Sequence, residues 1–243
     1  MKALLLLPLV VALFVSDARP AHAIAACNNN FGIAPRTGAV LPPHAKLVAF
    51  ADMESWSTHQ YTATLDGRPV KLTATKKKVA PYYMTELEVD STKPGTLKVY
   101  SGTKAEGAPL ATYTVNANAT LPKEVVGSTR RFTRDVQHST VKELFDALAI
   151  DLGDAPAILA TVKIRRDAAA SWSEFEVPVH SGGWMEPTKT KVLIGALGCT
   201  SNYTTALLEQ GVDLEVSVML PDGKSVPVKL PKRVVLPKPA KQP

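Results

Sequence analysis

Most of this sequence consists of short segments in which apolar and polar residues alternate, separated by Gly, Pro, Asn and Asp. Alternation puts the apolar side chains on one face of a strand, whereas an amphipathic helix requires a period near 3.6 residues. We therefore predict an all-β fold built from antiparallel β-sandwiches. The predicted strands are residues 46–51, 61–65, 70–75, 86–89, 96–100, 110–115, 131–136, 148–152, 158–164, 174–179, 191–195, 212–220 and 225–228.

Two Asp-Gly pairs predict tight hairpin turns. Asp66-Gly67 separates residues 61–65 from 70–75, and Asp222-Gly223 separates 212–220 from 225–228. Asp and Gly tolerate the positive φ angles that such turns need.

Two short helical segments interrupt the predicted strands. The spacing of Thr140 and Glu143 fits a capping box, so we expect a helical turn through Ala147 that runs into the strand 148–152. Residues 205–210 also read as a helical turn, ended by Gly211.

The distribution of strands predicts two domains in tandem. Residues 116–123 have no periodicity and contain Pro122, so we place the boundary there, which gives sandwiches at 24–118 and 119–230. Residues 231–243 are rich in Pro and Lys and are predicted to be a solvated tail. Each domain is long enough to bury a core without a cofactor, and we expect none.

The N-terminus has the pattern of a secretory signal peptide. Lys2 precedes the apolar residues 3–15, and Ala21-His22-Ala23 supplies small residues at the positions that signal peptidase reads. We expect residues 1–23 to be removed and the protein to be secreted or periplasmic. No later segment is apolar over the roughly 18 residues that a membrane-spanning helix requires.

The two cysteines leave two alternatives open. In an exported protein Cys27 and Cys199 are expected to form a disulfide, which would require the two domains to lie side by side, because bridged Cα atoms lie within about 7 Å. Alternatively, residues 24–27 resemble a bacterial lipobox, and an acylated Cys27 would anchor the protein at the outer membrane.

Residues 34–43, Ala-Pro-Arg-Thr-Gly-Ala-Val-Leu-Pro-Pro, lead into the strand at residue 46. This stretch resembles the opening of bacterial immunoglobulin-like domains, and the strand pattern of residues 121–230 is similar to immunoglobulin-like or fibronectin-type sandwiches. The resemblance implies two immunoglobulin-like sandwiches with a binding or scaffolding role, and it carries over no catalytic residue.

The same opening also resembles a family of periplasmic copper-binding sandwich proteins, whose mature chain begins with a histidine. His22 would take that place if cleavage followed Ala21, which makes copper binding an alternative function. The histidines at 22, 44, 59, 138 and 180 contain no close pair, however, and a copper site needs several converging nitrogen ligands. We therefore assign no metal site.

No catalytic motif is present, since the chain lacks a G-x-S-x-G elbow, an H-E-x-x-H helix, a phosphate-binding Gly-rich loop and a G-x-G-x-x-G turn. His180 and Ser181 are neighbours, but adjacent strand side chains point to opposite faces. Asp52 with Glu54 and Asp151 with Asp154 lack the ligand number that calcium requires. We predict that the protein is not an enzyme.

Aromatic residues in loops are the candidate binding residues: Trp56, Trp172, Trp184, Tyr82 and Tyr83. Exposed tryptophans could stack on sugar rings or anchor a protein, and buried ones would only cap the core. The tyrosines follow a run of three lysines, a combination that can hold an anionic glycan. Export and a net charge of only +6 argue against nucleic acid as the partner.

These observations predict an exported, non-enzymatic binding or scaffolding protein of the bacterial cell envelope, with a protein or an envelope polysaccharide as its partner. The alternatives are copper handling and carbohydrate binding through loop tryptophans.

Overall fold

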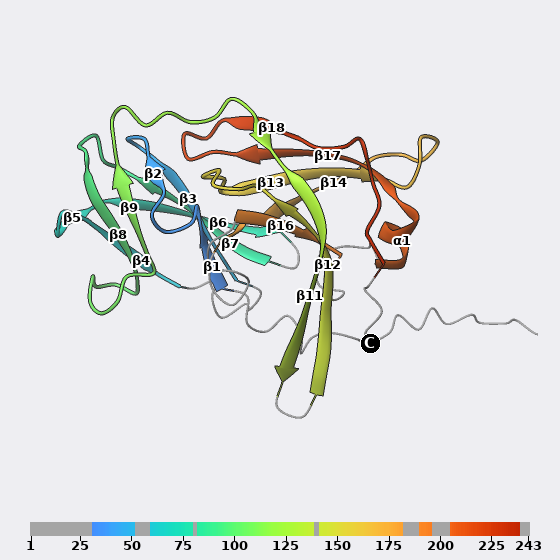
Figure 1. The fold of residues 1–243 in the computed structure, drawn as a ribbon. Helices are drawn as coiled ribbons and strands as arrows, with labels where there is room; N and C mark the ends of the chain where they lie inside the picture. The colour runs from blue at the N-terminus through green and yellow to red at the C-terminus, as the bar shows by residue number, and fades with distance from the viewer. Residues whose placement is uncertain are drawn as a thin grey trace, which may run out of the picture.

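The computed structural model describes residues 31–51, 59–79, 82–138, 141–181, 190–195 and 205–238. These residues form four β-sheets and one short helix, arranged as two sandwiches side by side (Figure 1). The prediction of an all-β fold of antiparallel sheets is confirmed. In the described ranges no helix has the length and apolar character needed to cross a membrane.

The first sandwich is built from residues 31–115. One sheet, called sheet A here, has the order β1-β3-β7-β6, and its partner, sheet B, has the order β2-β9-β8-β4-β5. The strands are β1 Phe31–Ala34, β2 Val40–Leu41, β3 Lys46–Ala51, β4 Tyr61–Leu65, β5 Arg68–Val70, β6 Leu72–Val79, β7 Tyr82–Val89, β8 Gly95–Ser101 and β9 Ala111–Val115.

The second sandwich is built from elements between residues 125 and 234. Sheet C has the order β10-β18-β17-β13-β14 with β19 also paired to β17, and sheet D has the order β11-β12-β16-β15. The elements are β10 Val125–Val126, β11 Ser128–His138, β12 Val141–Asp151, β13 Leu159–Arg165, β14 Ser173–Pro178, β15 His180–Ser181, β16 Thr190–Ile194, α1 Thr205–Gln210, β17 Val212–Met219, β18 Ser225–Lys229 and β19 Arg233–Val234.

Both Asp-Gly turns form, but the first hairpin is shorter than predicted. Asp66 and Gly67 have φ angles of 49° and 77°, and β4 pairs with β5 only as far as Val70. After Lys71 the chain crosses to sheet A, where β6 pairs with β7. The single strand predicted at 70–75 is therefore two strands in different sheets. Such a crossing connects the two layers of a sandwich.

The helical turn predicted from Thr140 to Ala147 is wrong, because residues 141–147 belong to β12. This strand pairs with β11 over its whole length, from His138↔Val141 to Ser128↔Asp151, and the resulting hairpin extends away from the body (Figure 1). The backbone ladder along this hairpin outweighs a local capping signal. The second predicted helix is confirmed as α1, with Gly211 following it at a φ of 90°.

Arg131 fastens the base of this hairpin to the rest of the second sandwich. Its guanidinium donates hydrogen bonds to Asp146 on β12, to Glu209 of α1 at 2.6 Å and to the carbonyl of Pro237 at 2.8 Å. The C-terminal segment is thus part of the fold: residues 233–234, which we assign to a tail from the sequence, form β19, and Leu236 is buried.

The two sandwiches share a core, because strand β3 of sheet A is buried on both faces. Leu47 and Ala49 of β3 belong to the core of the first sandwich. Val48 and Phe50 of the same strand, with Met84 of β7, belong to the core of the second sandwich. Every residue of β3 after Lys46 is buried.

Polar contacts reinforce this interface. The Lys46 backbone N–H donates to the Pro221 carbonyl at 2.7 Å, and Arg36 pairs with Asp154 at 2.7 Å. Lys77 on β6 pairs with Glu176 on β14 at 2.5 Å. Cys27 and Cys199 lie outside the described residues, so the disulfide and the lipid anchor both stay predictions.

The shared core predicts cooperative unfolding of both sandwiches. We expect Phe50→Ala to cost about 3–5 kcal/mol, the usual penalty for removing a buried phenyl ring, and to raise amide hydrogen exchange in both sandwiches. Leu97→Ala, a change confined to the first core, is the matched control and should raise exchange first in sheets A and B. If amide hydrogen exchange in the Phe50→Ala variant rises only in residues before 116, the two sandwiches do not share a core.

Candidate functional site

The candidate site is a groove on the outer face of sheet C. Alternate residues of β17, from Val212 to Val218, are buried in the core, so the residues between them point outward. On this outer face Lys163 of β13 lies opposite Glu215 of β17, and Thr161 lies opposite Ser217.

The groove exists because the strand beside β17 bulges. β17 pairs with β18 up to Val216↔Val228 and with β19 from Asp213↔Arg233. Residues 229–232 therefore face only residues 214–215 of β17. Pro231 lies within the bulge and cannot donate a backbone hydrogen bond, and the two strands rejoin where the Leu214 N–H donates to the Lys232 carbonyl at 3.1 Å.

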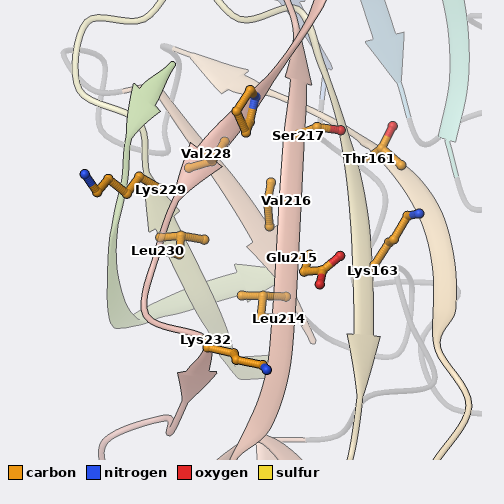
Figure 2. Close-up of a pocket in the computed structure, with 11 residues that line it drawn as sticks. Thr161, Lys163, Leu214, Glu215, Val216, Ser217, Val228, Lys229, Leu230 and Lys232 are labelled. Carbon is orange, nitrogen blue, oxygen red and sulfur yellow. The ribbon is translucent and has the colours of Figure 1, made fainter. Parts of the chain in front are cut away.

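The groove has a volume of about 430 Å³ and a mixed apolar and basic lining. Figure 2 shows Lys163 and Glu215 on one side of the central strand, β17, with Lys229 and Leu230 on the other. Three lysines against one glutamate give the lining a net positive charge. The full lining is Thr161, Lys163, Leu214, Glu215, Val216, Ser217, Pro227, Val228, Lys229, Leu230 and Lys232.

Two arginines hold one end of the groove rigid. Arg165 of β13 and Arg233 of β19 both donate to the carboxylate of Asp213, at 3.0 and 3.2 Å. Burial by itself would raise the pKa of Asp213, but the hydrogen bonds and positive charges of the two arginines outweigh it and hold that pKa below its usual value. Asp213 therefore stays ionised and links β13, β17 and β19.

Of the three tryptophans predicted to bind a ligand, Trp172 lies among the described residues. It lies between β13 and β14, it is 37% exposed, and the Arg165 guanidinium stacks 4.5 Å from the centre of its ring. Tyr83 lies on β7 in the other sandwich. Trp56, Trp184 and the Tyr82 side chain lie outside what the structure describes, so a binding surface formed by several loop aromatics stays a prediction.

The basic residues of the groove were missed by sequence reasoning. Lys232 belongs to residues 231–243, which we assign to a tail from the sequence, and Lys229 directly follows the predicted strand 225–228. The structure places both along sheet C. The available signal was Pro231, which interrupts an otherwise strand-like run and so indicates a bulge.

One pair of residues has the composition of a catalytic dyad. His59 Nε2 and Ser101 Oγ are hydrogen-bonded beside the pairing of β4 with β8. Acyl transfer also needs donors for the developing oxyanion, commonly including the N–H of the residue after the serine. Here the Gly102 N–H is bonded to the Gln60 carbonyl at 2.8 Å. The local geometry therefore gives no reason to make Ser101 a nucleophile.

The histidine that the sequence singled out, His180, is buried where the sandwiches meet. Its ring packs edge-on against Phe50 with the centroids 5.1 Å apart, and its partner in register is the fully buried Lys191. Burial and, secondarily, the charge of Lys191 lower the pKa of His180 to about 4. A neutral, buried imidazole at this position has a structural role.

No group of three or more potential metal ligands occurs among the residues that the structure describes. His22 and His138 lie, wholly or in their side chains, outside that part, so the copper alternative gains no structural support.

No protein-family model matches this chain, and no curated protein matches it. Among solved structures, tandem Ig repeats of Dlar match with a TM-score of 0.23 and 7% identity, over 83% of this chain and 99% of that chain. A chimeric titin Z1Z2 functionalized with an exogenous peptide from decorin matches with a TM-score of 0.22 and 14% identity, over 86% and 97%. TM-scores this low do not establish a shared fold, and the fold class rests on the four sheets themselves.

The burial of His180 predicts acid sensitivity. The unfolded chain protonates His180 below about pH 6.5, whereas the folded protein does so only near pH 4. Between these values the unfolded state binds more protons, so the free energy of unfolding falls as the pH falls. His180 accounts for about 3 kcal/mol of that loss.

Urea unfolding of wild type and His180→Gln at several pH values between about 7 and 4 measures this contribution. The fall should be smaller in the variant by about 3 kcal/mol. His44→Asn removes an exposed histidine whose φ of 54° asparagine tolerates, and it is the matched control for the loss of an imidazole outside the interface. Equal pH dependence in wild type and His180→Gln would refute a neutral buried imidazole.

Proposed function

We propose that this protein is a non-enzymatic binding or scaffolding protein of the bacterial cell envelope, and that it holds an anionic ligand in the groove on sheet C. Export is inferred from the N-terminal sequence alone. The binding role rests on the groove, whose lining combines the apolar side chains of Pro227 and Leu230 with three lysines.

The proposal rests on the exposure and the unneutralised charge of Lys229 and Lys232. Both are exposed at the bulge, and within the described ranges neither is joined to a carboxylate by an ion pair. Lys163 is already paired with Glu174 at 3.3 Å, so it contributes less free positive charge. Two ammonium groups without an ion pair, beside the side chains of Pro227 and Leu230, suit a ligand that carries negative charge.

The construction of the site also supports binding. Its floor is the central strand of a sheet, and Asp213 clamps the strands at one end through Arg165 and Arg233. A site on rigid strands loses little conformational entropy when it takes a ligand, and preorganisation of this kind raises affinity.

Charge reversal at the bulge tests the proposal. Titration calorimetry with polyglutamate and with polygalacturonate should detect binding of at least one polyanion to the wild type. Lys229→Glu combined with Lys232→Glu should weaken that binding about tenfold or more, because attraction is replaced by repulsion.

Lys71→Glu combined with Lys98→Glu makes the same change in net charge at exposed positions in the first sandwich. This control should bind within about twofold of wild type. Anion binding in the groove is refuted if neither polyanion binds, or if the two double variants lose affinity equally.

A further inference from the structure

An exposed valine borders the groove on its outer side. Val126 of β10 is 73% exposed, whereas its neighbour Val125 is buried in the core. Because successive strand residues point to opposite faces, Val126 lies on the same face as the groove. Its partner in register is Lys229.

The position of Val126 is fixed by close packing around it. The Gly127 N–H donates to the Lys229 carbonyl at 3.1 Å. A Cβ at Gly127 would lie 2.7 Å from Cγ1 of Val228 and 2.9 Å from Cδ2 of Leu230. The edge strand therefore sits tightly on the bulge and holds the Val126 side chain out in solvent, where it adds little to the stability of the core.

One side of the groove thus offers apolar and basic groups next to one another (Figure 2). Val126, Pro227 and Leu230 supply aliphatic surface, and Lys229 and Lys232 supply positive charge. No aromatic residue lines the groove among the described residues, so the ring stacking that commonly holds sugars is absent from this lining. Aliphatic contacts next to ammonium groups suit a ligand that alternates apolar and acidic groups.

We propose that the groove binds an extended acidic peptide segment of a partner protein, with aliphatic side chains on Val126 and Leu230 and carboxylates at Lys229 and Lys232. Neighbouring side chains of an extended peptide are only a few ångströms apart along its length, so aliphatic and acidic groups that alternate in sequence can meet Val126, Lys229 and Leu230 where these lie next to one another. Glu215 lies at the β13 side of the groove, where its charge repels acidic residues and favours carboxylates on the bulge side. This proposal rests on the proposed function and adds the class of ligand.

Fluorescence anisotropy with labelled ten-residue peptides tests the class of ligand. The peptide of alternating glutamate and leucine should bind the full chain at least about fivefold more tightly than the peptide of alternating glutamate and serine. A peptide of alternating lysine and leucine should not bind, because both bulge lysines repel it. Equal affinity for the glutamate–leucine and glutamate–serine peptides would overturn the role of the apolar border.

Val126→Asp is the sharpest variant, because the side chain is exposed and the fold does not depend on it. It should weaken binding of the glutamate–leucine peptide about tenfold and leave the midpoint of thermal unfolding unchanged. Val40→Asp is the matched control: Val40 is 46% exposed on β2 of the first sandwich, and this change should leave binding unaltered. Val126→Thr, which keeps the shape and neutrality of the side chain, should lower the affinity by a smaller factor.

The outcomes separate this inference from the proposed function. Binding of polygalacturonate that depends on Lys229 and Lys232, without binding of the glutamate–leucine peptide, would overturn the peptide assignment and leave the binding role intact. Failure of every anionic probe would overturn both. Equal loss of peptide affinity in Val126→Asp and Val40→Asp would show a general charge effect and refute the docking surface.

Discussion

The burial of one strand on both faces is the constraint on which the arrangement of this protein depends. Leu47 and Ala49 of β3 pack into the first sandwich, and Val48 and Phe50 pack into the second. A strand of this kind has no solvent face, so its apolar residues run without interruption. Removing the second sandwich would expose Val48 and Phe50 to water, so the contact between the two sandwiches stabilises both.

Strands that change sheets complete this arrangement. The chain leaves sheet B for sheet A at Lys71, and it leaves sheet C for sheet D at Val179, between β14 and β15. The second crossing lies at the interface, where β15 is next to β1 and His180 contacts Phe50. Sheet C keeps its outer face away from the shared core, and the bulge between β18 and β19 forms the groove on that face.

Local signals predicted local structure well. The Asp-Gly turns and the Gly-terminated helix α1 form where expected, because each depends on the conformational preferences of a few adjacent residues. The capping signal at Thr140 failed because β12 pairs with β11 along eleven positions, from Val141 to Asp151. The groove lysines escaped notice because residues 229–232 become a site only when a bulge sets them beside β17.

The alternation of apolar and polar residues was sufficient to determine that this chain forms β-sheets, since a period of two matches only the pleat of a strand. The order of the strands, the sharing of one core by two sandwiches and the position of Lys229 and Lys232 at a groove were decided by tertiary structure. Each of these depends on contacts between segments far apart in the chain, and no local pattern of residues specifies which segments meet.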